Sequence, residues 1–216
     1  MSITNGTQAQ MREEAYWRAW SHAQDGQWDQ AGQVLFSPEV SGETFPDLRV
    51  LGRTERRRKI YYTLAMGDVA VRLAHYEQAM FHYTQCITFL DERRMNNANL
   101  RVRALLGLGL THLLTGYSVS ALNYYTEALR VSGKDSCSEY VPDIYYGLCE
   151  ISRHQPNDER ALDYGKKALR LYIERGNKVL ECQMRNILGR IYYQMGDFES
   201  SNACYTESLA LAINVG

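Results

Sequence analysis

The chain of 216 residues has few of the residues that interrupt or cross-link a fold. Only four prolines occur, and because proline breaks helix interiors, long segments are free to be helical. The five cysteines are an odd number without close pairing, which indicates reduced thiols used as small buried residues. No segment approaches the roughly 20 apolar residues that span a bilayer, so we expect no membrane insertion. The polar first residues, 1–12, are unlike a secretory signal, and we therefore expect a soluble cytoplasmic protein.

The chain also lacks an excess of either charge. Lysine and arginine number 24 against 25 aspartates and glutamates, for a net charge of -1. Such a balance creates no overall field that would attract nucleic acid, and we expect no direct nucleic-acid binding. One local exception is the basic run at residues 53–59, which we interpret as a solvated helix end, with contact to phosphate or to an acidic partner as the alternative.

Motifs of chemistry are missing as well. The five histidines are scattered, with no H-E-x-x-H and no C-x-x-C pattern, so we predict no metal site. No serine or cysteine has the local signature of an activated nucleophile. We therefore predict that the protein is not an enzyme and needs no cofactor.

What the chain does have is an internal repeat. A small residue returns early in the second half of each unit, at intervals of 48, 42, 40 and 40 residues: Ala31, Ala79, Ala121, Ala161 and Ser201. Self-similarity at this period indicates a stacked solenoid. Apolar residues recur with the 3.6-residue period of a helix between short turns, which predicts an all-α fold, a right-handed superhelical solenoid of about five antiparallel helix pairs.

The expected boundaries follow from these patterns. First helices are predicted at residues 10–24, 54–73, 98–115, 142–154 and 178–195, and second helices at 28–36, 77–92, 118–132, 158–174 and 198–213. The repeats then lie near 12–36, 54–92, 98–132, 142–174 and 178–213. Residues 1–9 are interpreted as a flexible N-terminus, 10–216 as the array, and 36–53 as an inserted loop. Glycines such as Gly116 and Gly196 should end first helices, Asp197 and Asn157 should cap second helices, and Pro142 suits a first helical turn.

The repeated residues resemble the tetratricopeptide repeat family. The fifth copy carries the pattern most clearly, in Leu188-Gly189, Tyr192, Gly196-Asp197-Phe198, Ser201, Tyr205 and Ser208. Units of about 40 residues, longer than the family's usual 34, are similar to the long-repeat subgroup found in kinesin light chain and in bacterial peptide-sensing regulators. The resemblance implies a scaffold that binds protein or peptide, and it implies no particular partner.

In this family the first helices line a concave surface, so the resemblance also implies a site. Residues four and then three apart share one helical face, and the corresponding positions of successive first helices form what we call the first-helix stripe. The predicted partner-binding residues are Tyr16, Trp20, Asp68, Arg103, Tyr146, Glu150, Arg153, Asn186, Arg190 and Tyr193. In the third repeat the stripe reads Leu106, Leu110 and Leu113, for which burial in the core is the alternative. The stripe has no lysine, so it does not reproduce the family's carboxylate clamp for chaperone tails.

These observations favour a peptide-binding or protein-binding adaptor. Two alternatives stay open: the sensory portion of a transcriptional or signalling regulator, and a structural subunit of a larger assembly. The last predicted helix has an apolar face, with Leu209, Ile213 and Val215, that no further polar helix covers. We interpret that face as a surface for self-association into a homodimer, for a partner, or for further repeats.

Overall fold

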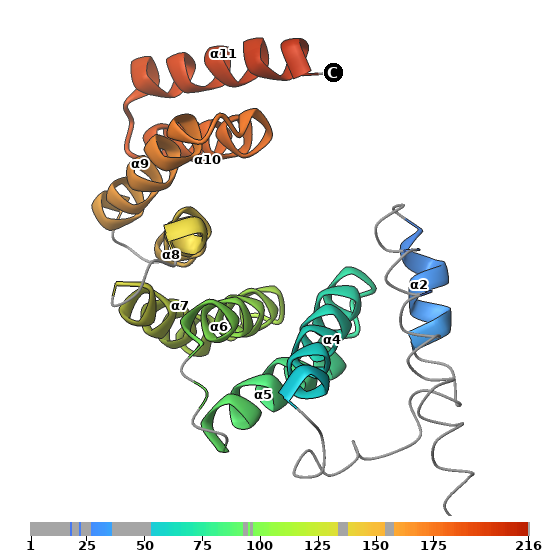
Figure 1. Ribbon diagram of the computed structural model, residues 1–216. Coiled ribbons are helices and arrows are strands. Elements are labelled where there is room, and N and C mark those ends of the chain that lie inside the picture. The colour runs from blue at the N-terminus through green and yellow to red at the C-terminus, as the bar shows by residue number, and fades with distance from the viewer. Residues whose placement is uncertain are drawn as a thin grey trace, which may run out of the picture. The chain divides into compact units, whose positions relative to one another are not determined.

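The computed structural model describes residues 18, 22, 27–35, 53–92, 95, 97–133, 138–153 and 158–215. These residues form α-helices and one 3-10 turn, and no strand occurs among them (Figure 1). The elements are α2 (Trp28–Leu35), α4 (Arg53–Arg72), α5 (Tyr76–Glu92), α6 (Ala98–Leu114), α7 (Ser118–Ser132), η1 (Ser138–Tyr140), α8 (Val141–Ser152), α9 (Asp158–Glu174), α10 (Lys178–Gln194) and α11 (Phe198–Val215).

Every helix in the described ranges lies within two residues of its predicted position. The predicted helix 10–24, the N-terminal segment 1–9 and nearly all of the predicted loop 36–53 lie outside the described residues, and Arg53 is already the first residue of α4. The agreement has a simple cause, because each helix boundary coincides with a break in the 3.6-residue apolar period.

The chain divides into two compact units, Met1–Leu100 and Arg101–Gly216. In the first unit α4 and α5 form a helix hairpin. Tyr83 of α5 packs on Gly67 of α4, where an added Cβ would lie 2.6 Å from the ring. The small residue Ala79 is fully buried beside this contact. A glycine opposite an aromatic residue therefore sets how closely the two helices approach.

The same contact recurs in the second unit. Tyr125 of α7 packs on Gly109 of α6, and Tyr205 of α11 packs on Gly189 of α10. In the fourth repeat the glycine lies on the second helix, as Gly165 of α9, and faces Cys149 of α8, where an added Cβ would lie 3.2 Å from the Cys149 sulfur. The glycine on α9 therefore makes room for the larger residue that this repeat has on α8.

The turns follow the predicted chemistry with one exception. Gly116 and Gly196 have positive φ, 84° and 80°, and end their first helices as expected. Asp197 caps α11 by accepting a hydrogen bond from the Ser200 backbone N–H at 3.0 Å, and Pro142 lies in the first turn of α8. Asn157 lies outside the described residues. In the α4–α5 turn the left-handed position is held by Ala74, with φ 58°.

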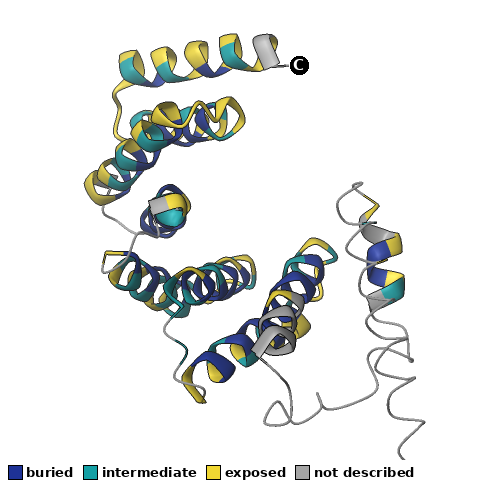
Figure 2. Cartoon of the chain, in the orientation of Figure 1, coloured by how far each residue is buried: buried dark blue, intermediate teal, exposed yellow. Residues whose placement is uncertain are grey.

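The last helix, α11, buries one side and exposes the other. Figure 2 shows its buried positions on the side facing α10 and exposed positions on the opposite side. Leu209 is 62% exposed and Ile213 is 73% exposed. The side chain of Val215 is outside the described residues. The uncovered apolar face predicted for this helix is thus present at two of its three residues.

Candidate partner-binding surface

In the first unit, the described residues of the first-helix stripe stabilise the fold of their own hairpin. Tyr16 and Trp20, its predicted members from the first repeat, lie outside the described residues. Asp68 on α4 accepts a hydrogen bond from the Tyr83 hydroxyl at 2.7 Å. Leu64, one turn earlier, is completely buried. The carboxylate of Asp68 therefore serves the aromatic packing of its own hairpin.

The α6 part of the stripe is apolar and partly open. Arg103 is half-buried, as are Leu106 and Leu113, and Leu110 is 39% exposed. Leu110 is therefore open to solvent, whereas the alternative interpretation as core stays open for the half-buried Leu106 and Leu113. Exposed leucines beside polar neighbours are suited to contact apolar side chains of a ligand.

On α8 two residues of the stripe that have opposite charges, Glu150 and Arg153, pair with each other. Arg153 donates from Nε and Nη2 to the two carboxylate oxygens of Glu150, at 2.9 and 2.8 Å. Their side chains are only 13% and 15% exposed. The hydrogen bond with Glu150 is also the largest reason why the pKa of Arg153 is raised. Because both charges are engaged, this pair positions its neighbours rather than offering a free charge.

Tyr146 interacts electrostatically with that pair and with two further tyrosines, Tyr125 and Tyr172, which in turn interact with Asp143. Of these four residues only Tyr146 was predicted from the sequence. Asp143 lies on α8 one turn before Tyr146 and accepts a hydrogen bond from the Tyr172 hydroxyl at 2.8 Å. Burial raises the pKa of Asp143, against the hydrogen bond from Tyr172 and the charge of Arg175. Burial likewise raises the pKa of Tyr146, and the negative charge of Glu150 adds to it.

The Tyr125 ring connects this cluster to the preceding hairpin. It packs against Gly109 on one side and reaches Gly147 of α8, where an added Cβ would lie 2.2 Å from the ring. Burial raises the pKa of Tyr125, with contributions from Tyr146 and Asp143. Spacing could have found Asp143, which lies three residues before Tyr146. No local signal could have found Tyr172, which meets α8 from α9.

On α10 the stripe is open to solvent. Asn186, Arg190 and Tyr193 are all exposed and follow one another at spacings of four and three residues. The Tyr193 ring makes an edge-to-face contact with Phe198 at 5.4 Å, and both rings are more than 60% exposed, at 62% and 63%. Phe198 was read only as part of the repeat motif, although it extends this surface.

Arg190 differs from most cations around it. In the second unit Arg130 pairs with Glu127, Lys167 with Asp163, and Arg185 with Glu181 and Glu207. Arg190 has no ion pair within the described part of the chain. An unpaired guanidinium beside an amide and two exposed aromatic rings can bind a carboxylate next to an apolar group.

The described residues contain no group of three or more histidines, cysteines, aspartates or glutamates that could hold a metal ion. Cys86, Cys149, Cys182 and Cys204 form no disulfide within the described residues, and Cys137 lies outside them. Burial raises the pKa of Cys149 to about 12, so this thiol stays protonated at neutral pH. No helix in the described ranges is long and apolar enough to cross a membrane.

Successive helix hairpins with a repeated glycine–aromatic contact define a helical-repeat solenoid. Residues 140–214 match the family model of the tetratricopeptide repeat. A kinesin light chain-related protein, number 3 of Arabidopsis thaliana, is 23% identical over 150 residues, which is 68% of this chain and 23% of that protein. The chain thus spans about a quarter of that relative. The resemblance to the tetratricopeptide repeat that the residues predicted is confirmed by the match at residues 140–214.

Solved structures share the fold. BtubC (BKLC) from P. vanneervenii has a TM-score of 0.72 at 16% identity, with 100% of this chain and 92% of that chain covered. A Rap protein complexed with Competence and Sporulation Factor has a TM-score of 0.74 at 14% identity, with 92% and 53% covered. The predicted all-α solenoid of helix pairs is confirmed by these likenesses.

Proposed function

We propose that this protein is a non-catalytic adaptor that binds a partner protein or peptide along the first-helix stripe, with α10 as the centre of the site. The observation that carries this proposal is the unpaired, exposed Arg190 on the same face as Asn186 and Tyr193. Arginine, tyrosine and tryptophan contribute most often to interface energy, and both Arg190 and Tyr193 are exposed here.

The chemistry of the site specifies a ligand. A guanidinium binds a carboxylate with two parallel hydrogen bonds. The Asn186 amide, one turn away, can both donate to and accept from a peptide backbone. Tyr193 and Phe198 together offer an aromatic surface to an apolar side chain. The ligand is therefore an extended segment with an acidic residue close to an apolar one.

Neighbouring positions define the remainder of the groove. Tyr146 on α8 is half-buried, and the Glu150–Arg153 pair beside it holds the surface in one arrangement. A preorganised surface loses less side-chain entropy when a ligand binds. Arg153 was also predicted to contact the partner, but Glu150 pairs with it, so we assign the binding of a carboxylate to Arg190.

A selection from a displayed peptide library, followed by affinity measurement on purified protein, tests this proposal. Asn186→Ala with Arg190→Ala should weaken binding of the selected acidic peptides by about a hundredfold, since each charged or amide contact contributes roughly 1–3 kcal/mol. The control is Arg170→Ala with Asn202→Ala, which removes an exposed arginine and an exposed asparagine from second helices. Equal affinity of the wild type and the Asn186/Arg190 variant would place the site elsewhere.

A second candidate is the peptide-sensing portion of a regulator, in which ligand binding changes the shape of the array. Its support is the likeness to a Rap protein whose structure contains Competence and Sporulation Factor. Small-angle scattering separates the two candidates. An adaptor keeps its radius of gyration when the selected peptide saturates it, whereas a switch becomes more compact or more extended.

We also propose that the exposed side of α11 supports self-association, as expected for a homodimer or for a structural subunit. Leu209 and Ile213 lie four residues apart on that side and are both exposed. Leu209→Ser with Ile213→Ser should convert any dimer seen in analytical ultracentrifugation to monomer. A wild-type chain that stays monomeric at high concentration would remove this proposal.

A further inference from the structure

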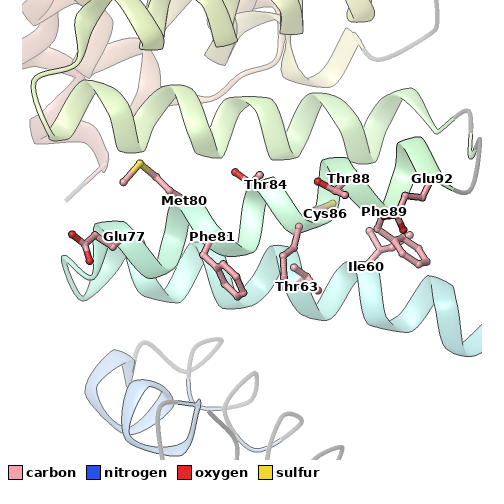
Figure 3. Close-up of a pocket in the computed structure, with 11 residues that line it drawn as sticks. Ile60, Thr63, Glu77, Met80, Phe81, Thr84, Cys86, Thr88, Phe89 and Glu92 are labelled. Atoms are coloured by element: carbon pink, nitrogen blue, oxygen red, sulfur yellow. The ribbon is translucent and has the colours of Figure 1, made fainter. Parts of the chain in front are cut away.

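A cleft of about 540 Å³ lies on the α4–α5 hairpin of the first unit (Figure 3). This volume falls within the roughly 300–1,000 Å³ typical of binding sites. Its floor is made of buried residues, including Ile60 and Thr63 from α4 and Cys86 and Phe89 from α5. No described residue of the first-helix stripe lines the cleft, and none of its lining residues lies on α10.

The open rim of the cleft is a single row along α5. The row consists of Glu77, Phe81, Thr84, Thr88 and Glu92, and all five residues are exposed. Phe81, in the middle, is 56% exposed, an unusual position for a phenylalanine. Figure 3 shows Glu77 and Glu92 at the two ends of the cleft. Fifteen residues of helix place these carboxylates about 22 Å apart along the axis.

The two carboxylates are unpaired in the described part of the chain, although Arg93 and Arg94 follow Glu92 directly in the sequence and lie outside it. Neither Glu77 nor Glu92 makes an ion pair in the described ranges, and the sequence of α5 contains no lysine or arginine. Glu92 also lies in the last turn, where the helix dipole disfavours a negative charge. A cation at this end would therefore be stabilised by both the carboxylate and the dipole.

The fourth repeat provides an internal comparison. Counted from the equivalent small residues Ala79 and Ala161, the row on α9 reads Glu159, Asp163, Lys166, Arg170 and Glu174. There Asp163 pairs with Lys167 at 2.7 Å and Glu174 with Arg170 at 3.6 Å. On α9 this face is exposed and charged residues on it form ion pairs. On α5 the equivalent face has Phe81 and two threonines between two glutamates that form no ion pair in the described ranges. The repeat fold does not require this difference.

We propose that the cleft binds an amphipathic helix of a partner protein, with apolar side chains facing Phe81 and a lysine or arginine near each end to meet Glu77 and Glu92. Charge complementarity selects this occupant, because an apolar stripe between two acidic ends matches a helix of about four turns with basic ends. The threonine hydroxyls of Thr84 and Thr88 provide polar contacts within the stripe. The site thus has the opposite charge preference to Arg190.

Two synthetic helical peptides of about 18 residues test the proposal on the full chain by fluorescence anisotropy. Both have the same leucine and methionine stripe, and they carry either lysine or glutamate at two positions fifteen residues apart, as Glu77 and Glu92 are. The basic-ended peptide should bind about tenfold more tightly than the acidic-ended one, because two partly exposed ion pairs change sign.

Variants assign the binding to the cleft. Glu77→Gln with Glu92→Gln should abolish the preference between the two peptides, while the control, Glu159→Gln with Glu174→Gln, should retain it. Phe81→Ser should weaken the binding of both peptides, and Arg190→Ala should leave the affinity for the basic-ended peptide unchanged. Circular dichroism checks that each variant is folded, as expected for exposed positions.

Three results would overturn the proposal. The first is equal binding of both peptides to the wild type. The second is an equal loss in the α9 control. The third is concentration-dependent self-association that Phe81→Ser removes while no peptide binds, since this outcome assigns the cleft to a second copy of the chain. Failure of the α10 site would leave all of these measurements unaffected.

Discussion

The α4–α5 hairpin of the first unit and the α10–α11 hairpin of the second are built by the same contact but expose side chains of opposite charge. Glycine opposite tyrosine sets the helix spacing at Gly67 and Tyr83 as it does at Gly189 and Tyr205. Yet α5 exposes phenylalanine and threonine between unpaired carboxylates, whereas α10 exposes an unpaired arginine beside aromatic rings. The repeat determines the buried positions and leaves the exposed ones free to acquire different partners.

Each unit also holds a histidine whose buried Nδ1 has no hydrogen-bond partner among the described residues, His82 in the first and His112 in the second, and His82 is the more deeply buried. His82 on α5 is buried, its Nδ1 has no hydrogen-bond partner, and burial lowers its pKa to about 4. In the unfolded chain His82 takes up a proton with its ordinary pKa of 6.5. The contribution of uncharged His82 to the free energy of unfolding is therefore complete above pH 6.5 and is lost as the pH falls toward 4.

The largest predicted effect is this pH dependence. Between pH 7 and pH 4 the first unit should lose about 3 kcal/mol of unfolding free energy through His82. His82→Leu should remove that loss, because an apolar residue of similar size needs no partner and binds no proton. Urea unfolding followed by tryptophan fluorescence measures it, since Trp17, Trp20 and Trp28 all belong to the first unit. An unchanged pH dependence in the variant would contradict the assignment.

A matched pair of glycine substitutions sharpens the comparison next. Gly67→Ala should destabilise by about 2 kcal/mol, because Tyr83 is 2% exposed, is held by Asp68 and cannot move away from the added methyl. Gly189→Ala should change stability by less than about 1 kcal/mol, since Tyr205 is 38% exposed and the helix gains from alanine. Thermal unfolding of both variants measures the difference. Equal losses would show that the two hairpins are packed alike.

The smallest predicted effect is a stabilisation. Ala74 holds a left-handed conformation that Gly116 and Gly196 hold in the second unit. Ala74→Gly should therefore stabilise the first unit by about 1 kcal/mol, because only glycine adopts that conformation without strain. Chemical denaturation of the variant tests this, and a destabilised variant would mean that the loss of chain entropy exceeds the strain.

The positions of the helices could be predicted because each depends on local periodicity. The cap at Asp197 could be predicted from that residue alone. The left-handed conformation of Ala74 could not be predicted, since its turn lacks the glycine that marks the others. The strain there is imposed by packing of the flanking helices, which no local pattern reveals.

The candidate site was predictable where it depends on one helix. Asn186, Arg190 and Tyr193 share a face by spacing, and Arg190 has no acidic residue three or four positions away, whereas Arg153 has Glu150. The contact between Tyr172 and Asp143 joins residues 29 apart and needed the structure. The α5 cleft needed it too, because Phe81 looks like a core residue until its exposure is known.

The central claim is that Arg190 selects the charge of the bound partner. Peptide selection against the wild type and against Arg190→Glu tests it most directly, because the reversal changes one charge and leaves the helix intact. Peptides selected by the wild type should be enriched in aspartate or glutamate next to an apolar residue, and those selected by Arg190→Glu in lysine or arginine at the same position. The same peptides emerging from both selections would contradict the account.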